Sequence, residues 1–106
     1  MTLADILNLT YPSGVVSGQS FDIEWDIENI GSGSGYMWTT LYDTTNHTGI
    51  YYDNSYYYTG QTYPHTKSYT LFSSNMFRLE AGHWSNNPVK PARIKDEEEE
   101  FEIVIW

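Results

Sequence analysis

The residues with the clearest potential for chemistry are four carboxylates in the stretch FDIEWDIEN. Asp22, Glu24, Asp26 and Glu28 alternate with apolar residues, so in a β-strand they would follow one face at intervals of about 6 to 7 Å. Carboxylate pairs at comparable distances serve glycosidases as acid and base. That chemistry needs two unlike environments that separate the pKa values of the pair, whereas four acids on one exposed face share one environment. The pattern therefore favours a solvated strand face over a catalytic or cation-binding one.

Two further pairs could offer oxygen ligands to a hard cation such as Ca²⁺. Asp43 with Asn46, and Asp53 with Asn54, combine a carboxylate with an amide oxygen, but neither pair has the D-x-D-x-D-G spacing of a calcium-binding loop. Asp and Asn also favour turns, because their side chains hydrogen-bond to nearby backbone. Turn formation explains these residues, and the sequence predicts no metal site.

Motifs for catalysis are missing from the sequence. His47, His65 and His83 have no HxH or HxxxH spacing, and the chain contains no cysteine. No G-x-S-x-G, Walker or HExxH motif occurs either. We therefore expect a protein that is not an enzyme and that binds no cofactor.

The aromatic residues are the more informative set, because ten Tyr, four Trp and four Phe occur in 106 residues. Strands favour aromatic rings, so several of these rings could simply cover the core. Tyr and Trp also dominate protein interfaces and offer flat surfaces to sugars. We predict an aromatic outer face with a binding role, formed by Tyr36, Trp38, Tyr42, Tyr51, Tyr52, Tyr56, Tyr57 and Tyr58.

Length and charge limit the classes of partner. A chain of 106 residues predicts a single domain, 1–106. Five basic residues against fourteen acidic ones give a net charge of −9, which would repel nucleic acid and anionic membranes. No apolar run is long enough to span a bilayer, and the start MTLADILNLT does not look like a signal peptide.

Alternating apolar and polar residues predict short strands separated by Gly, Asn, Ser and Pro. The clearest strand is 20–28, with Phe21, Ile23, Trp25 and Ile27 on its core face. Residues 2–9 fit a strand better than the alternative short helix, and residues 53–64 are either an edge strand or an ordered loop. Further strands are predicted at 36–43, 50–52, 65–72, 76–84 and 99–106. The whole predicts an all-β, immunoglobulin-like antiparallel β-sandwich of about seven to eight strands.

Three segments are expected to lie outside the strands. Residues 29–35 form a flexible Gly/Ser connection, and residues 85–94 form a loop that contains Pro88 and Pro91. The acidic run 96–100 is expected to be solvated or mobile, with protection of a sheet edge or a subunit contact as alternatives. The acceptor patterns at Asn8 and Asn46 give weak support to exposure outside the cell.

The stretch SGQSFDIEWDIENIGSGSG resembles the CARDB-type domains, the cell-adhesion-related immunoglobulin-like modules of bacteria and archaea. A Gly and a polar residue precede an alternating strand that ends in Asn29-Ile30-Gly31, and a strand like FRLEAGHW leads to the Asn86-Asn87 loop. The basic segment PVKPARIK departs from the family pattern. The resemblance implies a seven-stranded sandwich used as a spacer, adhesion or assembly unit, with no catalytic residues to carry over.

These observations favour a non-enzymatic structural, assembly or adhesion module that acts through protein contacts of its aromatic face. Other protein subunits, in a homo-oligomer or a capsid lattice, are the expected partners. A virion decoration protein or a subunit of an extracellular or cell-surface structure would fit. The alternative is a carbohydrate-binding module that stacks glycans on Trp38 and the neighbouring tyrosines. A Ca²⁺-stabilised adhesion domain is a third interpretation.

Overall fold

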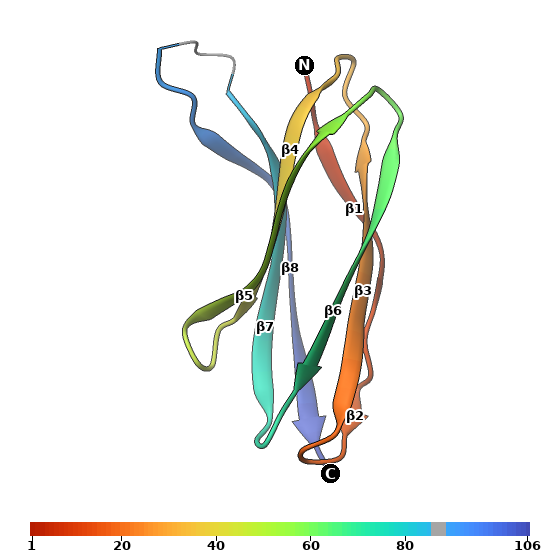
Figure 1. Cartoon of the computed structure of the whole chain (residues 1–106), viewed down its shortest axis with the longest axis vertical. Coiled ribbons are helices and arrows are strands. Elements are labelled where there is room, and N and C mark those ends of the chain that lie inside the picture. The colour runs from red at the N-terminus through yellow and green to blue at the C-terminus, as the bar shows by residue number, and fades with distance from the viewer. Residues whose placement is uncertain (86–88) are drawn as a thin grey trace.

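The computed structural model describes residues 1–85 and 89–106. Eight strands are present in these residues and pack as two sheets, with the two termini at opposite ends of an elongated body (Figure 1). The body measures 47 × 26 × 16 Å. The strands are β1 (Ala4–Thr10), β2 (Gly14–Val15), β3 (Ser20–Asn29), β4 (Gly35–Asp43), β5 (Thr48–Tyr57), β6 (Thr62–Thr70), β7 (Asn75–Trp84) and β8 (Arg93–Ile105).

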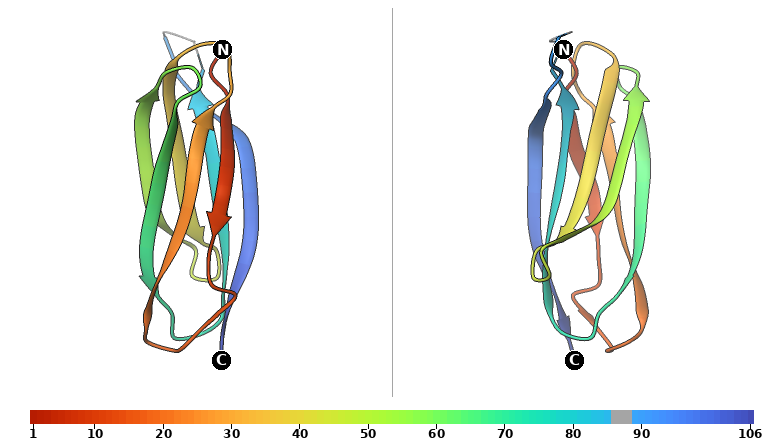
Figure 2. Two further views of the ribbon diagram at one scale, coloured as in Figure 1. Left: turned by 90° about the vertical axis from the view of Figure 1, so that its right-hand side faces the viewer. Right: turned by 60° about the vertical axis from the view of Figure 1, so that its left-hand side comes forward.

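The two sheets have three and five strands. The smaller sheet has the order β1-β3-β6 and the larger one the order β2-β8-β7-β4-β5, as the two views in Figure 2 show from opposite faces. Every pairing is antiparallel except the short contact between β2 and β8, which is parallel. The structure thus confirms the predicted all-β antiparallel sandwich.

The core lies between the sheets and follows the period of two in the sequence. In β3, Ile23, Trp25 and Ile27 are buried while the intervening acids point away from the core. The larger sheet supplies the opposing layer from alternate positions, namely Met37, Leu41, Phe77, Leu79, Phe101 and Ile103. Burying each such side chain contributes about 1.5 to 3 kcal/mol to folding, so this layer is what holds the two sheets together.

The four carboxylates of β3 lie on the outer face of the three-stranded sheet. Asp22 accepts a hydrogen bond from the Ser68 hydroxyl at 2.7 Å, and Asp26 accepts one from the Asn8 side chain at 2.9 Å. Asp22 and Glu24 are exposed, as a solvated strand face requires. These contacts join neighbouring strands and give the acids a structural explanation.

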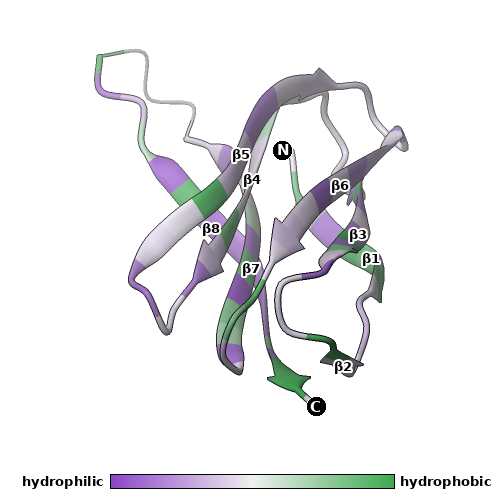
Figure 3. Cartoon of the chain, turned by 60° about the horizontal axis from the view of Figure 1, so that its bottom comes forward, coloured by the Kyte–Doolittle hydropathy of each residue, from purple (hydrophilic) through white to green (hydrophobic). Residues whose placement is uncertain are grey.

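Two segments differ from the sequence prediction. The acidic run 96–100 lies within β8, which begins at Arg93, so Glu98 to Glu100 are exposed as a solvated run requires, but Asp96 and Glu97 are partly buried. Figure 3 shows this strand changing from a hydrophilic middle to a hydrophobic end. Residues 29–35 are not a flexible tether, because buried Asn29 accepts from the Gly31 amide at 3.0 Å and donates to the Gly33 carbonyl at 2.9 Å.

The remaining predicted strands are present with shifted ends. The strand interpretation of residues 2–9 is confirmed by β1, and the predicted edge strand within 53–64 is the second half of β5, which ends at Tyr57. A turn then leads to β6, which starts at Thr62, three residues before the predicted start at His65. The predicted loop 85–94 falls partly on residues 86–88, which lie outside the described residues.

Candidate functional site

The predicted aromatic set is divided between the two faces of β4 and β5. Tyr36, Tyr52, Tyr56 and Tyr58 are exposed on the outside, with 56, 54, 42 and 65% of their surface accessible. Tyr36 lies directly opposite Tyr56 across the β4–β5 pair. The rings of Tyr36 and Tyr56 meet edge to face at 5.3 Å, and those of Tyr56 and Tyr58 do so at 5.3 Å. We call Tyr36, Tyr52, Tyr56 and Tyr58 the outer tyrosines.

Tyr51 and Tyr57 point inward, so the prediction of one outer surface is wrong for these two residues. Tyr57 is 1% exposed, and its hydroxyl lies 3.0 Å from Nε2 of His65. The Tyr51 hydroxyl lies 2.8 Å from Nδ1 of the same ring. The period of two sends odd positions of β5 toward the core, and the run of adjacent tyrosines concealed which of them would be buried.

Trp38 lies on the outer face of β4 but is not an open platform, because only 3% of it is exposed. The Arg93 guanidinium lies 4.0 Å from the centre of a Trp38 ring and 5.4 Å from that of Tyr52. On the neighbouring strand, a Cβ at Gly82 would meet the Trp38 ring at 2.6 Å. Trp38 therefore fills a slot that Gly82 leaves open. Tyr42 is similarly occupied by Arg78, at 4.8 Å.

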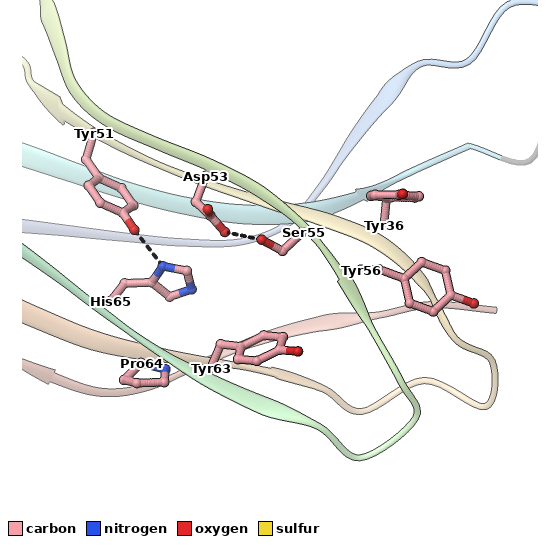
Figure 4. Close-up of a pocket in the computed structure, with 8 residues that line it drawn as sticks. All are labelled: Tyr36, Tyr51, Asp53, Ser55, Tyr56, Tyr63, Pro64 and His65. Carbon is pink, nitrogen blue, oxygen red and sulfur yellow. Dashed lines mark hydrogen bonds between the residues drawn. The ribbon is translucent and has the colours of Figure 1, made fainter.

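A pocket of 460 Å³ opens beside the outer tyrosines, at the side of the sandwich where β5 faces β6. Figure 4 shows Tyr51 and His65 at one end of this pocket and Tyr36 and Tyr56 at the other. The Ser55 hydroxyl donates to the Asp53 carboxylate at 2.9 Å on the upper wall. The lining residues are Tyr36, Tyr51, Asp53, Ser55, Tyr56, Tyr63, Pro64 and His65.

The inner wall of this pocket is kept neutral by burial. Burial lowers the pKa of His65, although the negative charges of Asp53 and Asp26 act in the opposite direction. Burial likewise raises the pKa of Tyr57 and of Tyr51, with a further increase from Asp53. An uncharged imidazole between two uncharged phenols offers hydrogen bonds and no net charge, so Asp53 is the charged group in the lining.

The opposite side of the sandwich, between β1 and β8, is closed by two carboxylates from the acidic run. Asp96 accepts the Ala4 amide at 2.9 Å and contacts Nδ1 of His83 at 2.7 Å. Glu97 accepts the Ile6 amide at 2.9 Å. A hydrogen bond with the Asp5 carboxyl group, together with burial, raises the pKa of Glu97. The register of β8 shifts between its partners Ala81 and Gly82, which turns both acids toward β1.

Asp43 does not serve as an open cation ligand. Its carboxylate is buried and accepts hydrogen bonds from the Asn46 amide at 3.1 Å and from three side chains. Those donors are Asn46, Tyr69 and Asn75, at 2.8, 2.9 and 2.7 Å. Burial raises the pKa of Asp43, but these hydrogen bonds together outweigh it and lower the pKa below its usual value. Turn formation thus explains the Asp43 and Asn46 pair, as predicted.

The three histidines lie in different places. His47 is in the turn after β4, with a φ of 53°, His65 is in β6 and His83 is in β7. Among residues 1–85 and 89–106, no group of three or more His, Asp or Glu side chains is arranged to hold a metal ion. The same residues contain no helical segment with the length and apolarity needed to cross a bilayer.

Known proteins resemble the chain in structure but not in sequence. No protein-family model matches it, and no curated protein does. The crystal structure of a CARDB domain from Pyrococcus furiosus, in complex with di-metal ions, matches with a TM-score of 0.69 and 14% identity, covering 100% of this chain and 88% of that one. The solution NMR structure of a CARDB domain from the same organism gives 0.70 and 18%, covering 99% and 97%. The chain has a CARDB-like fold.

The CARDB-like fold also matches part of much larger proteins. A β-glucosidase from Listeria innocua, in complex with glucose, matches with a TM-score of 0.60 and 15% identity, covering 98% of this chain. The match covers 16% of the enzyme's chain. At this level of identity the likeness concerns the fold alone.

Sequence reasoning missed several residues that shape the two sides of the CARDB-like sandwich. Tyr63 and Pro64 line the pocket although they precede the strand that the sequence predicts at 65–72. Asp96 and Glu97 belong to a run of five acids, and their charge does not distinguish them from Glu98 to Glu100. The only signal for them was the alternation of β8 counted backward from Phe101, and the register shift interrupts that alternation.

Proposed function

We propose that the chain is a non-enzymatic structural and assembly module that makes protein contacts through the outer tyrosines. The observation that carries this proposal is the exposure of Tyr36, Tyr52, Tyr56 and Tyr58 together on two adjacent strands and the turn that follows. A cluster of large rings left in water on a sheet face is typical of interaction sites. Each ring also loses little conformational freedom when it is buried, since Tyr has only two side-chain torsions.

The distribution of charge supports the same surface. The acids of β3 lie on the outer face of the other sheet, and those of β8 follow the far side of the large sheet. The strand β5 carries a single acid, Asp53. In a protein of net charge −9, an approach through β5 therefore meets few negative charges on the strand itself. A virion or an extracellular structure remains our proposed setting for such an assembly.

The test is self-association measured by sedimentation velocity between about 1 μM and 1 mM, the range of weak protein contacts. The wild-type chain should form larger species with rising concentration, and a Tyr36→Ser/Tyr56→Ser/Tyr58→Ser variant should stay monomeric. Tyr57 is left intact because its ring is buried. Val16→Ser/Phe72→Ser is the matched control, since it removes exposed apolar side chains away from the outer tyrosines. A wild-type chain that stays monomeric, or a tyrosine variant that assembles as the wild type does, would refute the proposal.

Carbohydrate binding is the second candidate, and the pocket between β5 and β6 favours it. Trp38 is too well covered to stack on a sugar, but Tyr56 and Tyr63 line the pocket near the Asp53 carboxylate. Rings beside a hydrogen-bonding carboxylate suit a neutral polyhydroxylated ligand. A glycan array should then show binding that Tyr63→Ser abolishes and Phe72→Ser leaves unchanged. An array without signal removes this candidate.

A further inference from the structure

A β-sandwich exposes the outer strands of both sheets, and each such edge can pair with another chain unless something blocks it. In the smaller sheet the edge strands are β1 and β6. In the larger sheet one edge is β5, and the other is β8 with β2 added at its end. Comparing these edges shows which one is available.

The β1 edge is blocked by side chains. The Ala4 and Ile6 amides donate to Asp96 and Glu97, so they are not free to pair with a strand. The register of β1 against β3 also shifts between Leu7 and Thr10, and Asn8 adopts a φ of 55°. Such an irregularity interrupts the flat template that edge pairing needs.

The β8 edge is covered at one end and charged along the rest. β2 pairs with β8 at Val104 and Ile105, and the Trp106 amide donates to the Val15 carbonyl at 3.1 Å. Upstream of this cover, β8 carries the acidic run and Glu102. A row of carboxylates on an edge opposes the approach of a second acidic chain.

The β6 edge has two other protections. Pro64 has no amide hydrogen to donate to an incoming strand. Lys67 lies opposite Ile23, which is fully buried, and so belongs to the inward face of the sheet. A charged residue that points inward at an edge is a known device against edge pairing, because pairing would bury its charge.

The β5 edge lacks most of these features, and Asp53 is its inward-facing charged residue. Its ten residues, TGIYYDNSYY, include no Pro, no Lys and one acid, Asp53. In the described residues no strand pairs with its outer side, and from Tyr51 to Tyr57 its pairing with β4 continues without a shift. This is a regular edge, seven residues long over that stretch, next to the outer tyrosines.

The sequence of β5 is complementary to itself in one antiparallel register. When Asn54 faces Asn54 of a second copy, Tyr52 faces Tyr56 of that copy, and Asp53 faces Ser55. Each carboxylate then faces the Ser55 side chain of the other copy and not a second carboxylate, and aromatic rings pair on the outer face. A register centred on Asp53 would place two carboxylates opposite each other, and one centred on Tyr52 would place Asn54 opposite Ile50. The register centred on Asn54 is therefore the favoured one.

We propose that two copies of this chain pair through their β5 edges, antiparallel about Asn54, and join their five-stranded sheets into one continuous sheet. This inference rests on the proposed assembly function and names the partner and the contact. The pairing brings the outer tyrosines of both copies onto one surface. Because the strand added beside β5 is itself an edge of the second sandwich, the contact is closed and two-fold symmetric.

The experiment introduces a negative or a positive charge at Asn54 and then mixes the two variants. This position is chosen because the symmetry axis passes beside it. Asn54→Asp keeps an oxygen for the Trp84 indole, which donates to the Asn54 side chain at 2.9 Å, but it places two carboxylates opposite each other. Asn54→Lys places two ammonium groups there. An equimolar mixture pairs Asp with Lys. Gln19→Glu is the matched control, since it makes the same amide-to-acid change in an exposed turn before β3.

Sedimentation velocity on the full chain should show a dimer for the wild type and for Gln19→Glu. Each Asn54 variant alone should dimerise at least about tenfold more weakly, which corresponds to about 1.4 kcal/mol, and the mixture should recover the dimer. Near-ultraviolet circular dichroism of the tryptophans confirms that each variant is folded. An Asn54→Asp chain that dimerises as the wild type does, or a mixture that does not recover, overturns the pairing.

The tyrosine variant separates this inference from the proposed function. If Tyr36→Ser/Tyr56→Ser/Tyr58→Ser abolishes assembly while the Asn54 variants assemble as the wild type does, the outer tyrosines act in assembly and the strand pairing is wrong. If the charge exchange behaves as expected while the tyrosine variant still dimerises, the pairing holds and the aromatic contact is wrong.

Discussion

The two sheets of this sandwich meet at two lateral sides, and the contacts between their edge strands differ from one side to the other. Between β1 and β8, the carboxylates of Asp96 and Glu97 reach across and accept the amides of the neighbouring edge strand. Between β5 and β6, the side chains that point inward make the contact, because the His65 ring lies against the hydroxyls of Tyr51 and Tyr57. Outside that contact lies the 460 Å³ pocket. We call these the closed side and the open side.

The difference underlies our proposal for where this chain accepts a partner. Charged acceptors on the closed side use the backbone groups that a second chain would need, and the acidic surface there repels acidic neighbours. On the open side Asp53 is the one acid of β5, and in the described residues no strand pairs with the outer side of β5. If assembly uses the open side as we propose, substitutions on the two sides should have separable effects on stability and on assembly.

The largest effect is expected on the closed side. Asp96→Ala leaves the Ala4 amide without its acceptor and the His83 ring without its partner, both in a nearly dry environment. Removing one member of a buried pair costs about 3 kcal/mol, so the free energy of unfolding should fall by about that amount in urea titrations. Glu102→Ala, an exposed site on the same strand, is the control. A loss below about 1 kcal/mol would mean that Asp96 does not close this side.

On the open side, His65→Ala should lower the free energy of unfolding by about 2 kcal/mol. The substitution removes the partner of two tyrosine hydroxyls and a ring stacked on Trp25, with centroids 5.7 Å apart. Self-association should persist, since the outer side of β5 is unchanged. Denaturant titration gives the stability, and sedimentation gives the assembly. Loss of assembly in a chain that remains folded would contradict the separation of the two sides.

The two sides should respond to pH with opposite signs. Burial lowers the pKa of His65, so the folded chain prefers the neutral ring. Stability from this group is fully present above the unfolded pKa near 6.5 and is lost as the pH falls toward the folded value. The contact with Asp5 raises the pKa of Glu97, so its contribution is present at low pH and is lost as the pH rises through the folded value.

The pH dependence can be divided by two neutral variants. His65→Gln should remove the loss of thermal stability on acidification from pH 7 to pH 5.5. Glu97→Gln should remove the opposing gain in the range just above 4.5, the usual pKa of a Glu side chain. Melting temperatures measured across this pH range, with Gln19→Glu as the control, separate the contribution of His65 from that of Glu97. Identical pH profiles for the wild type and both variants would show that neither side titrates as described.

Much of the fold can be predicted from the local pattern of apolar and polar residues. The alternation in 20–28 assigns each apolar residue of β3 to the core face and each acid to the outer face. The position of the sheet edges was not accessible, because it depends on which strands pair across long stretches of chain. β8 was predicted too short, since five consecutive acids contradict the preference of strands while tertiary contacts override it.

The candidate site was only partly accessible for the same reason. The sequence marked the tyrosines as a set, yet Tyr56 and Tyr57 differ only in strand phase, and one is exposed while the other is buried. The covering of Trp38 depends on Arg93, which is 55 positions away in the chain. Contacts of this kind follow from packing between strands, and no local spacing encodes them.

The smallest effect is expected from the acids that first suggested chemistry. Glu24→Gln should change the free energy of unfolding by no more than about 0.5 kcal/mol, because the side chain is exposed on the outer face of β3. Assembly should be unchanged as well, since this face belongs to neither lateral side. A urea titration and a sedimentation run on this variant suffice. A change above about 1 kcal/mol would give the acidic row a role beyond solvation.

The central claim is that the β5 edge is free in the monomer and paired in the assembly, whereas the β1 edge is satisfied within the chain. Amide hydrogen exchange followed as a function of protein concentration tests it most directly. Protection of the Ala4 and Ile6 amides should be the same at all concentrations, while protection within Tyr52 to Tyr56 should grow as the chain associates. Protection of β5 that does not depend on concentration, in samples that do associate, would contradict the claim.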